Sequence, residues 1–250
     1  MIADLDSHLH RPFDRDDWPR FLLLGTLLVF TAGHVVSTVL LAGYATRLAR
    51  SVRDDAPRPT FADLPSLARD GVLAVAVVAA YHVPTLVAFA ATALAARSSA
   101  VVAPGLAAAV TAPGAFTLGS FGRVVGGAPA VAVGLAVSAA LALVAGYLSA
   151  AAFVRFARGG TVGDGLDLAT VWALARTRGF LGTWLVGVMV LFATRLASGV
   201  LSAVPVAGSL LAAAATFVVG SLVVELVADR SPVASGRGVD ERDAGPVTVA

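Results

Sequence analysis

The chain has 250 residues, of which 58% are hydrophobic and 14% are charged, and its mean hydropathy is +0.85. A soluble domain carries about a quarter of charged residues, whereas here the apolar residues gather in runs of roughly 20 or more, as membrane-spanning helices require. The formal net charge is +2, and the arginines stand beside these runs, which favours lipid headgroups over nucleic acid as their partners. The lack of Cys excludes disulfides, iron–sulfur clusters and thiol chemistry.

A polar tail over residues 1–19 precedes the first expected span, residues 21–46. Trp18 stands at its edge, where an indole favours the membrane interface. Arg47, Arg50 and Arg53 follow its far end. Because the run is longer than the core of a signal peptide and leads into arginines instead of a cleavage site, we expect an uncleaved span.

A short helix at the membrane interface is expected to begin at Thr60, with Asp63 complementing its positive end. The second span follows over residues 71–96. Residues 98–127 are apolar but interrupted by Pro104, Pro113 and several glycines. They leave three readings open, namely a loop, a re-entrant segment and a further span.

The third span is expected over residues 128–153, and Arg155 and Arg158 follow it. Asp164 and Asp167 then repeat the helix-start signal, and Leu168, Val171 or Trp172, and Ala175 are expected to line one face of a second interfacial helix. The last two spans cover residues 180–203 and 206–228, and residues 230–250 form a polar tail that is expected to be disordered. The fold class predicted is therefore all-α: one polytopic membrane domain over residues 20–229, with about five transmembrane helices and two short interfacial amphipathic helices.

The arginines predict the orientation, because cytoplasmic segments next to spans are rich in positive charge. One group of arginines lies within residues 47–69 and another within residues 155–178. Five spans place both groups in the cytoplasm, with the N-terminus outside and the C-terminus inside. A crossing by residues 98–127 would put one group outside, so we expect an outer-face loop there. The expected location is the cell membrane.

Charged and titratable side chains at membrane depth usually face protein or water. His34 and His82 both fall near the middle of their expected spans, so that His34, His82 and Tyr81 could meet if these spans are neighbours. Such a pair could relay protons or bind an ion. The alternative is two neutral imidazoles that are hydrogen-bonded to carbonyl or hydroxyl groups.

Arg195 and Glu225 lie in the last two spans, but their depths differ too much for an ion pair. We expect Glu225 to meet water near the cytoplasmic end. Arg195 either snorkels to the outer end or faces inward as a site for an anion or a carbonyl cluster.

Other motifs carry little chemistry. Asp4, Asp6, His8 and His10 are metal-ligand residue types, but a disordered tail is the favoured interpretation. No phosphate-binding loop, catalytic triad or pair of carboxylates stands at a suitable spacing, so the sequence predicts no catalytic residue, no cofactor and no metal.

A family resemblance rests on Gly43-Tyr44-Ala-Thr-Arg47-Leu-Ala-Arg50 and on three later segments, at residues 69–73, 153–168 and 204–208. In their order and spacing these segments resemble domain of unknown function family 4013, a family of haloarchaeal membrane proteins. The resemblance covers roughly residues 12–230. It implies a multi-span helical membrane protein from a halophilic archaeon and no known activity.

Two functions are compatible with this sequence. The first is a non-enzymatic membrane protein that acts through packing, lipids, a second copy or other membrane proteins. The second is a small transporter or channel component with a polar path involving His34, His82 and Arg195. A membrane enzyme lacks any acid–base or metal cluster in or beside the spans.

Overall fold

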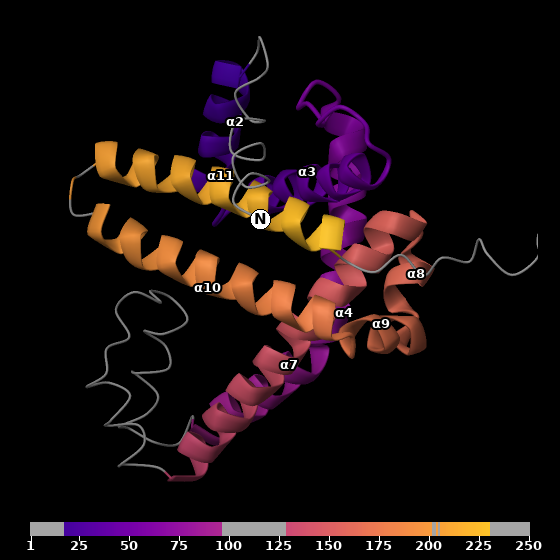
Figure 1. Cartoon of the computed structure of the whole chain (residues 1–250). Coiled ribbons are helices and arrows are strands. Elements are labelled where there is room, and N and C mark those ends of the chain that lie inside the picture. Colours follow the sequence, from indigo (N-terminus) through magenta and orange to yellow (C-terminus); the bar gives the residue numbers. More distant parts are fainter. Residues whose placement is uncertain (1–17, 97–128, 202–203, 205, 231–250) are drawn as a thin grey trace, which may run out of the picture.

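The computed structural model describes residues 18–96, 129–201, 204 and 206–230, and each regular element within them is a helix (Figure 1). In chain order these are α2 (Trp18–Phe30), α3 (Val35–Arg53), α4 (Leu64–Ala96), α7 (Pro129–Gly159), α8 (Val162–Leu166), α9 (Leu168–Ala175), α10 (Arg178–Leu201) and α11 (Ala207–Arg230). Of these, α4, α7, α10 and α11 are long and apolar enough to cross a membrane. The described part of the chain is all-helical, and the protein is a multi-pass membrane protein, as its composition predicts. The expected outer-face loop over residues 98–127 lies outside the described residues.

The first expected span is not one helix. The chain leaves the α-helix after Phe30 and resumes it at Val35, so one continuous helix over residues 21–46 is wrong. Thr31 Oγ1 donates to the carbonyl of Leu27 at 2.7 Å, and Gly33 weakens helix propagation at the same place. Hydropathy alone hid this break because the apolar run continues through it.

The interfacial helix expected from Thr60 is also wrong as a separate element. Helix α4 begins at Leu64 and continues as one helix of 33 residues through the expected second span. Asp63 supports its first turn by accepting from the backbone N–H of Ser66 at 3.3 Å. Helix α4 continues through Gly71. The role of this glycine is in packing, since a Cβ there would lie 1.9 Å from the carbonyl oxygen of Val39 on α3.

The second interfacial element is present as the short helices α8 and α9. Asp167 caps α9 by accepting from the backbone N–H of Ala169 at 3.1 Å. Its buried face consists of Val171, Leu174 and Ala175, whereas Leu168 and Trp172 are exposed. The expected apolar face was therefore right for Val171 and Ala175 and wrong for Leu168 and Trp172, which are exposed.

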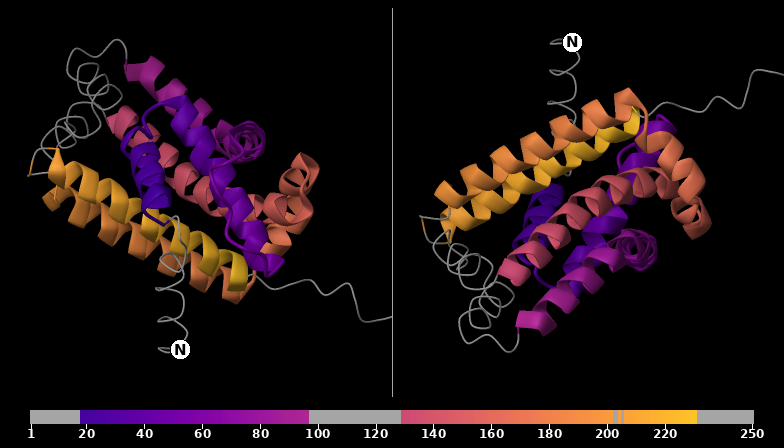
Figure 2. Two further views of the ribbon diagram at one scale, coloured as in Figure 1. Left: turned by 90° about the horizontal axis from the view of Figure 1, so that it is seen from above. Right: turned by 90° about the horizontal axis from the view of Figure 1, so that it is seen from below.

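Two helical hairpins make up the body of the molecule, α4 with α7 and α10 with α11. The hairpins meet at the end that carries α8 and α9 and diverge away from it (Figures 1 and 2). Helices α3, α7 and α11 finish at that end, and α4 and α10 begin there. We call it the arginine end, because five arginines make contacts between elements there: Arg47, Arg50, Arg53, Arg58 and Arg158. Helix α2 crosses α11, and Gly25 faces the ring of Phe217.

Burial is concentrated toward the arginine end. One core gathers Val77 of α4, Phe156 of α7, Val171 of α9 and Phe180 of α10, all at most 1% exposed. A second core is a group of four aromatic rings whose centroids lie 5.0–6.3 Å apart: Phe21, Tyr44, Phe61 and Phe217. Toward the other end the long helices expose apolar side chains, as lipid-facing helices do.

Candidate functional site

Each of the two histidines predicted at membrane depth is hydrogen-bonded to a backbone carbonyl three or four residues earlier in the chain. His34 is exposed at the break between α2 and α3, and its Nδ1 lies 3.1 Å from the carbonyl oxygen of Thr31. His82 lies on α4 with Nδ1 3.0 Å from the carbonyl oxygen of Val78, one turn earlier. These contacts match the alternative that the sequence left open, two imidazoles bonded to carbonyl groups.

The depths of His34 and His82 do not match in the folded chain. Helices α3 and α4 touch where Gly71 faces Val39. His34 precedes Val39 by five residues, and His82 follows Gly71 by eleven. At about 1.5 Å per residue, His82 therefore stands roughly 9 Å farther from the arginine end than His34. Tyr81 is engaged elsewhere, because its hydroxyl donates to the carbonyl of Gly165 at 2.9 Å and joins α4 to α8.

Arg195 lies on α10 and lines a pocket of about 350 Å³ between α2, α10 and α11. Neither histidine and no other candidate polar residue from the spans lines this pocket. Among the described residues, the predicted polar positions thus occupy three separate places.

Arginines bind the helices together at the arginine end. Arg47 Nε donates to Asp70 Oδ2 at 3.0 Å, and Arg50 Nη1 lies 3.4 Å from the other carboxylate oxygen of Asp70. The Asp70 side chain is only 19% exposed, so two half-buried arginines of α3 neutralise one carboxylate of α4. The residues expected to orient the protein in the membrane therefore also join α3 to α4.

Three arginines also bond to carbonyl groups near helix C-termini. Arg50 Nε donates to the carbonyl of Ala157 at 3.1 Å, and Arg53 donates to the carbonyl of Arg158, both near the end of α7. Arg158 Nη2 in turn donates to the carbonyl of Ala228 at 3.0 Å, near the end of α11. The last carbonyls of a helix lack partners within it and form its negative end. These bonds tie α3, α7 and α11 together, and they place arginines of both groups at the same end of the molecule.

The sequence missed an ion pair between Arg58 and Glu225. Arg58 stands in the segment between α3 and α4, and Glu225 lies on α11, where it was expected to meet water. That expectation is wrong: the two side chains form an ion pair and are only 13% and 6% exposed. A glutamate inside an apolar helix was the available signal, but only the fold shows that residue 58 reaches it.

Arg155, the remaining predicted anchor, lies beside the carboxylates that cap α8 and α9. The pKa of Asp164 is lowered first by a hydrogen bond from the Thr161 side chain and further by Arg155. The pKa of Asp167 is lowered first by the Thr170 side chain, and Arg155 adds to the effect. Thr161 and Asp164 bond reciprocally in a capping box. These carboxylates therefore stabilise helix ends.

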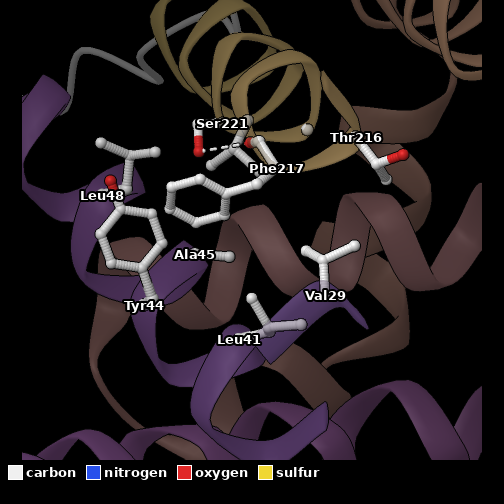
Figure 3. A pocket seen from close by; sticks show the side chains of 10 residues that line it. Val29, Leu41, Tyr44, Ala45, Leu48, Thr216, Phe217 and Ser221 are labelled. Carbon is white, nitrogen blue, oxygen red and sulfur yellow. Dashed lines mark hydrogen bonds between the residues drawn. The ribbon is translucent and has the colours of Figure 1, made fainter. Parts of the chain in front are cut away.

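Two apolar grooves flank α11. The hairpin groove, about 280 Å³, lies between the two hairpins and is lined by side chains of α3, α4, α7, α10 and α11, among them Trp184 and Val223. The α2 groove, about 220 Å³, lies between α2, α3 and α11. Figure 3 shows Tyr44 and Phe217 toward one end of the α2 groove and Val29 toward the other. Val224 lines both grooves.

Glycines in this chain serve two opposite purposes. At Gly43 and Gly71 a Cβ would lie 2.0 and 1.9 Å from a backbone oxygen of the neighbouring helix, so these glycines allow α3 and α4 to pack closely. At Gly146 in the hairpin groove and Gly220 in the α2 groove, a Cβ would meet nothing within 4 Å. These two glycines bring no helix closer and leave their grooves unfilled.

The site offers space and apolar surface instead of reactive groups. Within the described part of the chain, no three His, Asp or Glu residues are placed to hold a metal ion.

Comparison with known proteins identifies the family to which the chain belongs. No curated protein and no solved structure matches the chain. A family model described as protein of unknown function (DUF4013) matches residues 26–228. This match covers most of the chain, including all the described spans and both grooves. The chain therefore belongs to the DUF4013 family of proteins of unknown function.

Proposed function

We propose that this protein is a non-enzymatic membrane protein that binds the acyl chains of lipids in the two grooves beside α11. The observation that carries the proposal is the empty space at Gly146 and Gly220. Both glycines lie in grooves with an almost wholly apolar lining. A groove of this kind within a membrane protein favours a flexible apolar ligand, and lipid chains surround the spans at far higher concentration than any protein partner.

The driving force for such binding differs from that in water. Lipid tails are as apolar as the groove, so moving a chain from the bilayer into the groove gains no hydrophobic free energy. The gain comes from van der Waals contacts with the fixed groove walls, which are individually small and add up along the chain. We therefore expect modest affinity, fast exchange and little selectivity for the chain itself.

The arginine end fits the same proposal. Its arginines fasten the hairpins at one end through Asp70, Glu225 and helix C-termini, while the other end stays apart. Because arginine-rich ends of spans face the cytoplasm, we propose that this end and the C-terminus are cytoplasmic and that the membrane is the cell membrane. The N-terminus outside the cell stays a prediction, since it concerns residues before Trp18.

The experiment is photo-crosslinking in lipid bilayers. The protein is reconstituted with a phospholipid that carries a diazirine within one acyl chain, and the labelled peptides are identified by mass spectrometry. Gly146→Leu fills the hairpin groove and Gly220→Leu fills the α2 groove. Gly182→Leu is the matched control, because Gly182 also has open space at Cβ but lies on the exposed face of α10.

We expect wild type and Gly182→Leu to be labelled at groove-lining residues such as Trp184 and Val223. Gly146→Leu should lose label in the hairpin groove and keep it in the α2 groove, and Gly220→Leu should show the reverse. Label confined to exposed residues such as Met189, with no effect of either filling variant, would rule out the proposal. Crosslinks between two copies through the grooves would instead assign them to a dimer interface.

A further inference from the structure

A second kind of site lies at the end of the α10–α11 hairpin opposite the arginine end. The pocket that contains Arg195 is lined by two serines, Ser198 of α10 and Ser209 of α11, and by Val29 and Phe30 of α2. No carboxylate lines it among the described residues. This mixed lining of one cation, hydroxyl groups and apolar side chains distinguishes the pocket from the two apolar grooves.

Arg195 is an exposed cation within an otherwise apolar helix. Within the described part of the chain it makes no hydrogen bond and no ion pair, in contrast to Arg47, Arg50 and Arg58. It lies six residues, or roughly 9 Å, before the end of α10 at Leu201. A charge is costly at such a depth unless a counter-charge or water compensates it. The open side of this pocket can supply either.

The surroundings of Arg195 favour an anion. Ser198 follows Arg195 by three residues, so both side chains share a face of α10. The Ser198 Oγ atom is buried and has no hydrogen-bond partner among the described residues. Ser209 stands in the first turn of α11, a helix of 24 residues whose N-terminus is the positive end of its dipole. A guanidinium, a hydroxyl donor and a positive helix end thus converge on one pocket.

We propose that this pocket binds a phosphate group, with Arg195 as its main ligand and with the Ser198 hydroxyl as a second donor once its side chain turns toward the pocket. The planar guanidinium donates two parallel hydrogen bonds to phosphate oxygens, a geometry that lysine does not reproduce. Val29 and Phe30 beside it offer an apolar surface for the upper acyl carbons of a phospholipid. The phosphate belongs either to a lipid headgroup or to free inorganic phosphate.

The test uses the full-length protein in detergent micelles, with binding measured by native mass spectrometry. The probes are a phosphatidylglycerol, a diacylglycerol of the same chain length that lacks the phosphate, and inorganic phosphate. The variants are Arg195→Gln, Arg195→Lys and Ser198→Ala. Arg69→Gln is the matched control, since it removes the same charge from an exposed arginine outside the pocket. Monodisperse elution and an unchanged helical signal establish that each variant is folded.

We expect wild type and Arg69→Gln to bind phosphatidylglycerol more tightly than diacylglycerol, and Arg195→Gln to bind it about tenfold more weakly, as the loss of charge-assisted hydrogen bonds predicts. Arg195→Lys should recover only part of the affinity, and Ser198→Ala should lose a few-fold. Displacement of the lipid by millimolar phosphate, or binding of phosphate alone that Arg195→Gln abolishes, assigns the site to free phosphate. Equal affinity for both lipids, or an equal loss of affinity in Arg195→Gln and Arg69→Gln, overturns the phosphate proposal. Neither result bears on the proposal that the grooves bind acyl chains.

Discussion

The ion pair between Arg58 and Glu225 offers the sharpest test of how the arginine end is held together. Its two side chains are only 13% and 6% exposed. It joins the segment before α4 to α11, the helix between the two grooves. The perturbation is a cycle of Arg58→Met, Glu225→Leu and the double variant, which replaces both charged side chains by apolar ones of similar size.

The magnitude follows from burial. Removing one partner of a buried pair leaves an uncompensated charge and costs about 3–5 kcal/mol, whereas replacing both with apolar residues is often close to neutral. The two single variants should differ. Glu225 is a short side chain on a helix and cannot reach water when Arg58 is lost. Arg58 has a long stem on a connecting segment and can turn toward water when Glu225 is lost. We expect Arg58→Met to lower the free energy of unfolding by about 4 kcal/mol and Glu225→Leu to lower it by about 2 kcal/mol.

The assay is unfolding in mixed micelles with increasing SDS, followed by circular dichroism, which gives the free energy of unfolding of each variant. The double variant should lie within about 1.5 kcal/mol of wild type, so the coupling energy of the cycle should exceed about 3 kcal/mol. Losses that simply add in the double variant would refute the reasoning, as would a loss below about 1 kcal/mol for Arg58→Met.

Two further predictions concern helix packing and helix caps. Gly71→Ala should lower the free energy of unfolding by about 3 kcal/mol or more, because its Cβ would meet the backbone of α3. Gly182→Ala, where the space is open, should raise it by about 0.5–1 kcal/mol through helix propensity, and SDS unfolding of both variants checks the contrast. The Asp164 carboxylate has a lowered pKa in the folded chain because of Thr161 and Arg155, so its stabilising effect is present above the ordinary value of 3.8 and is lost as the pH falls through the lowered folded value. The stability difference between wild type and Asp164→Ala should therefore be positive at neutral pH and shrink toward zero in acid. A difference that stays constant with pH would show that the carboxylate charge does not matter.

Hydropathy predicts the parts of this fold that depend on composition alone. The helical class, the four long spans and the gathering of the arginines at one end follow from apolar runs and their charged borders. Hydropathy did not predict the break at residues 31–34, because Thr31 and Gly33 change the backbone without ending the apolar run. The continuity of α4 was not predicted, because Gly71 was taken as the start of a separate span. In the structure Gly71 lies within the helix and contacts α3.

The candidate site was harder to predict because it depends on which helices face each other. The depths of His34 and His82 were counted from the ends of their expected spans, and the contact of Gly71 with Val39 gives α3 and α4 a different register. Glu225 was expected to meet water because it lies near the cytoplasmic end of its span. Its partner, Arg58, lies far away in sequence and outside the spans, so the sequence did not reveal the ion pair. The grooves leave no signal at all, since Gly146 and Gly220 look like any other glycine in an apolar helix until their surroundings are known.

The most direct measurement of the central claim is a structure of the protein in lipid nanodiscs, determined by electron cryo-microscopy with a bound antibody fragment to add mass. The acyl-chain proposal predicts elongated density in the hairpin groove beside Gly146 and in the α2 groove beside Gly220. It also predicts that this density disappears from the hairpin groove in Gly146→Leu and persists in Gly182→Leu. A hairpin groove closed by direct packing of α10 on α7, or filled by a side chain of a second copy, would contradict it.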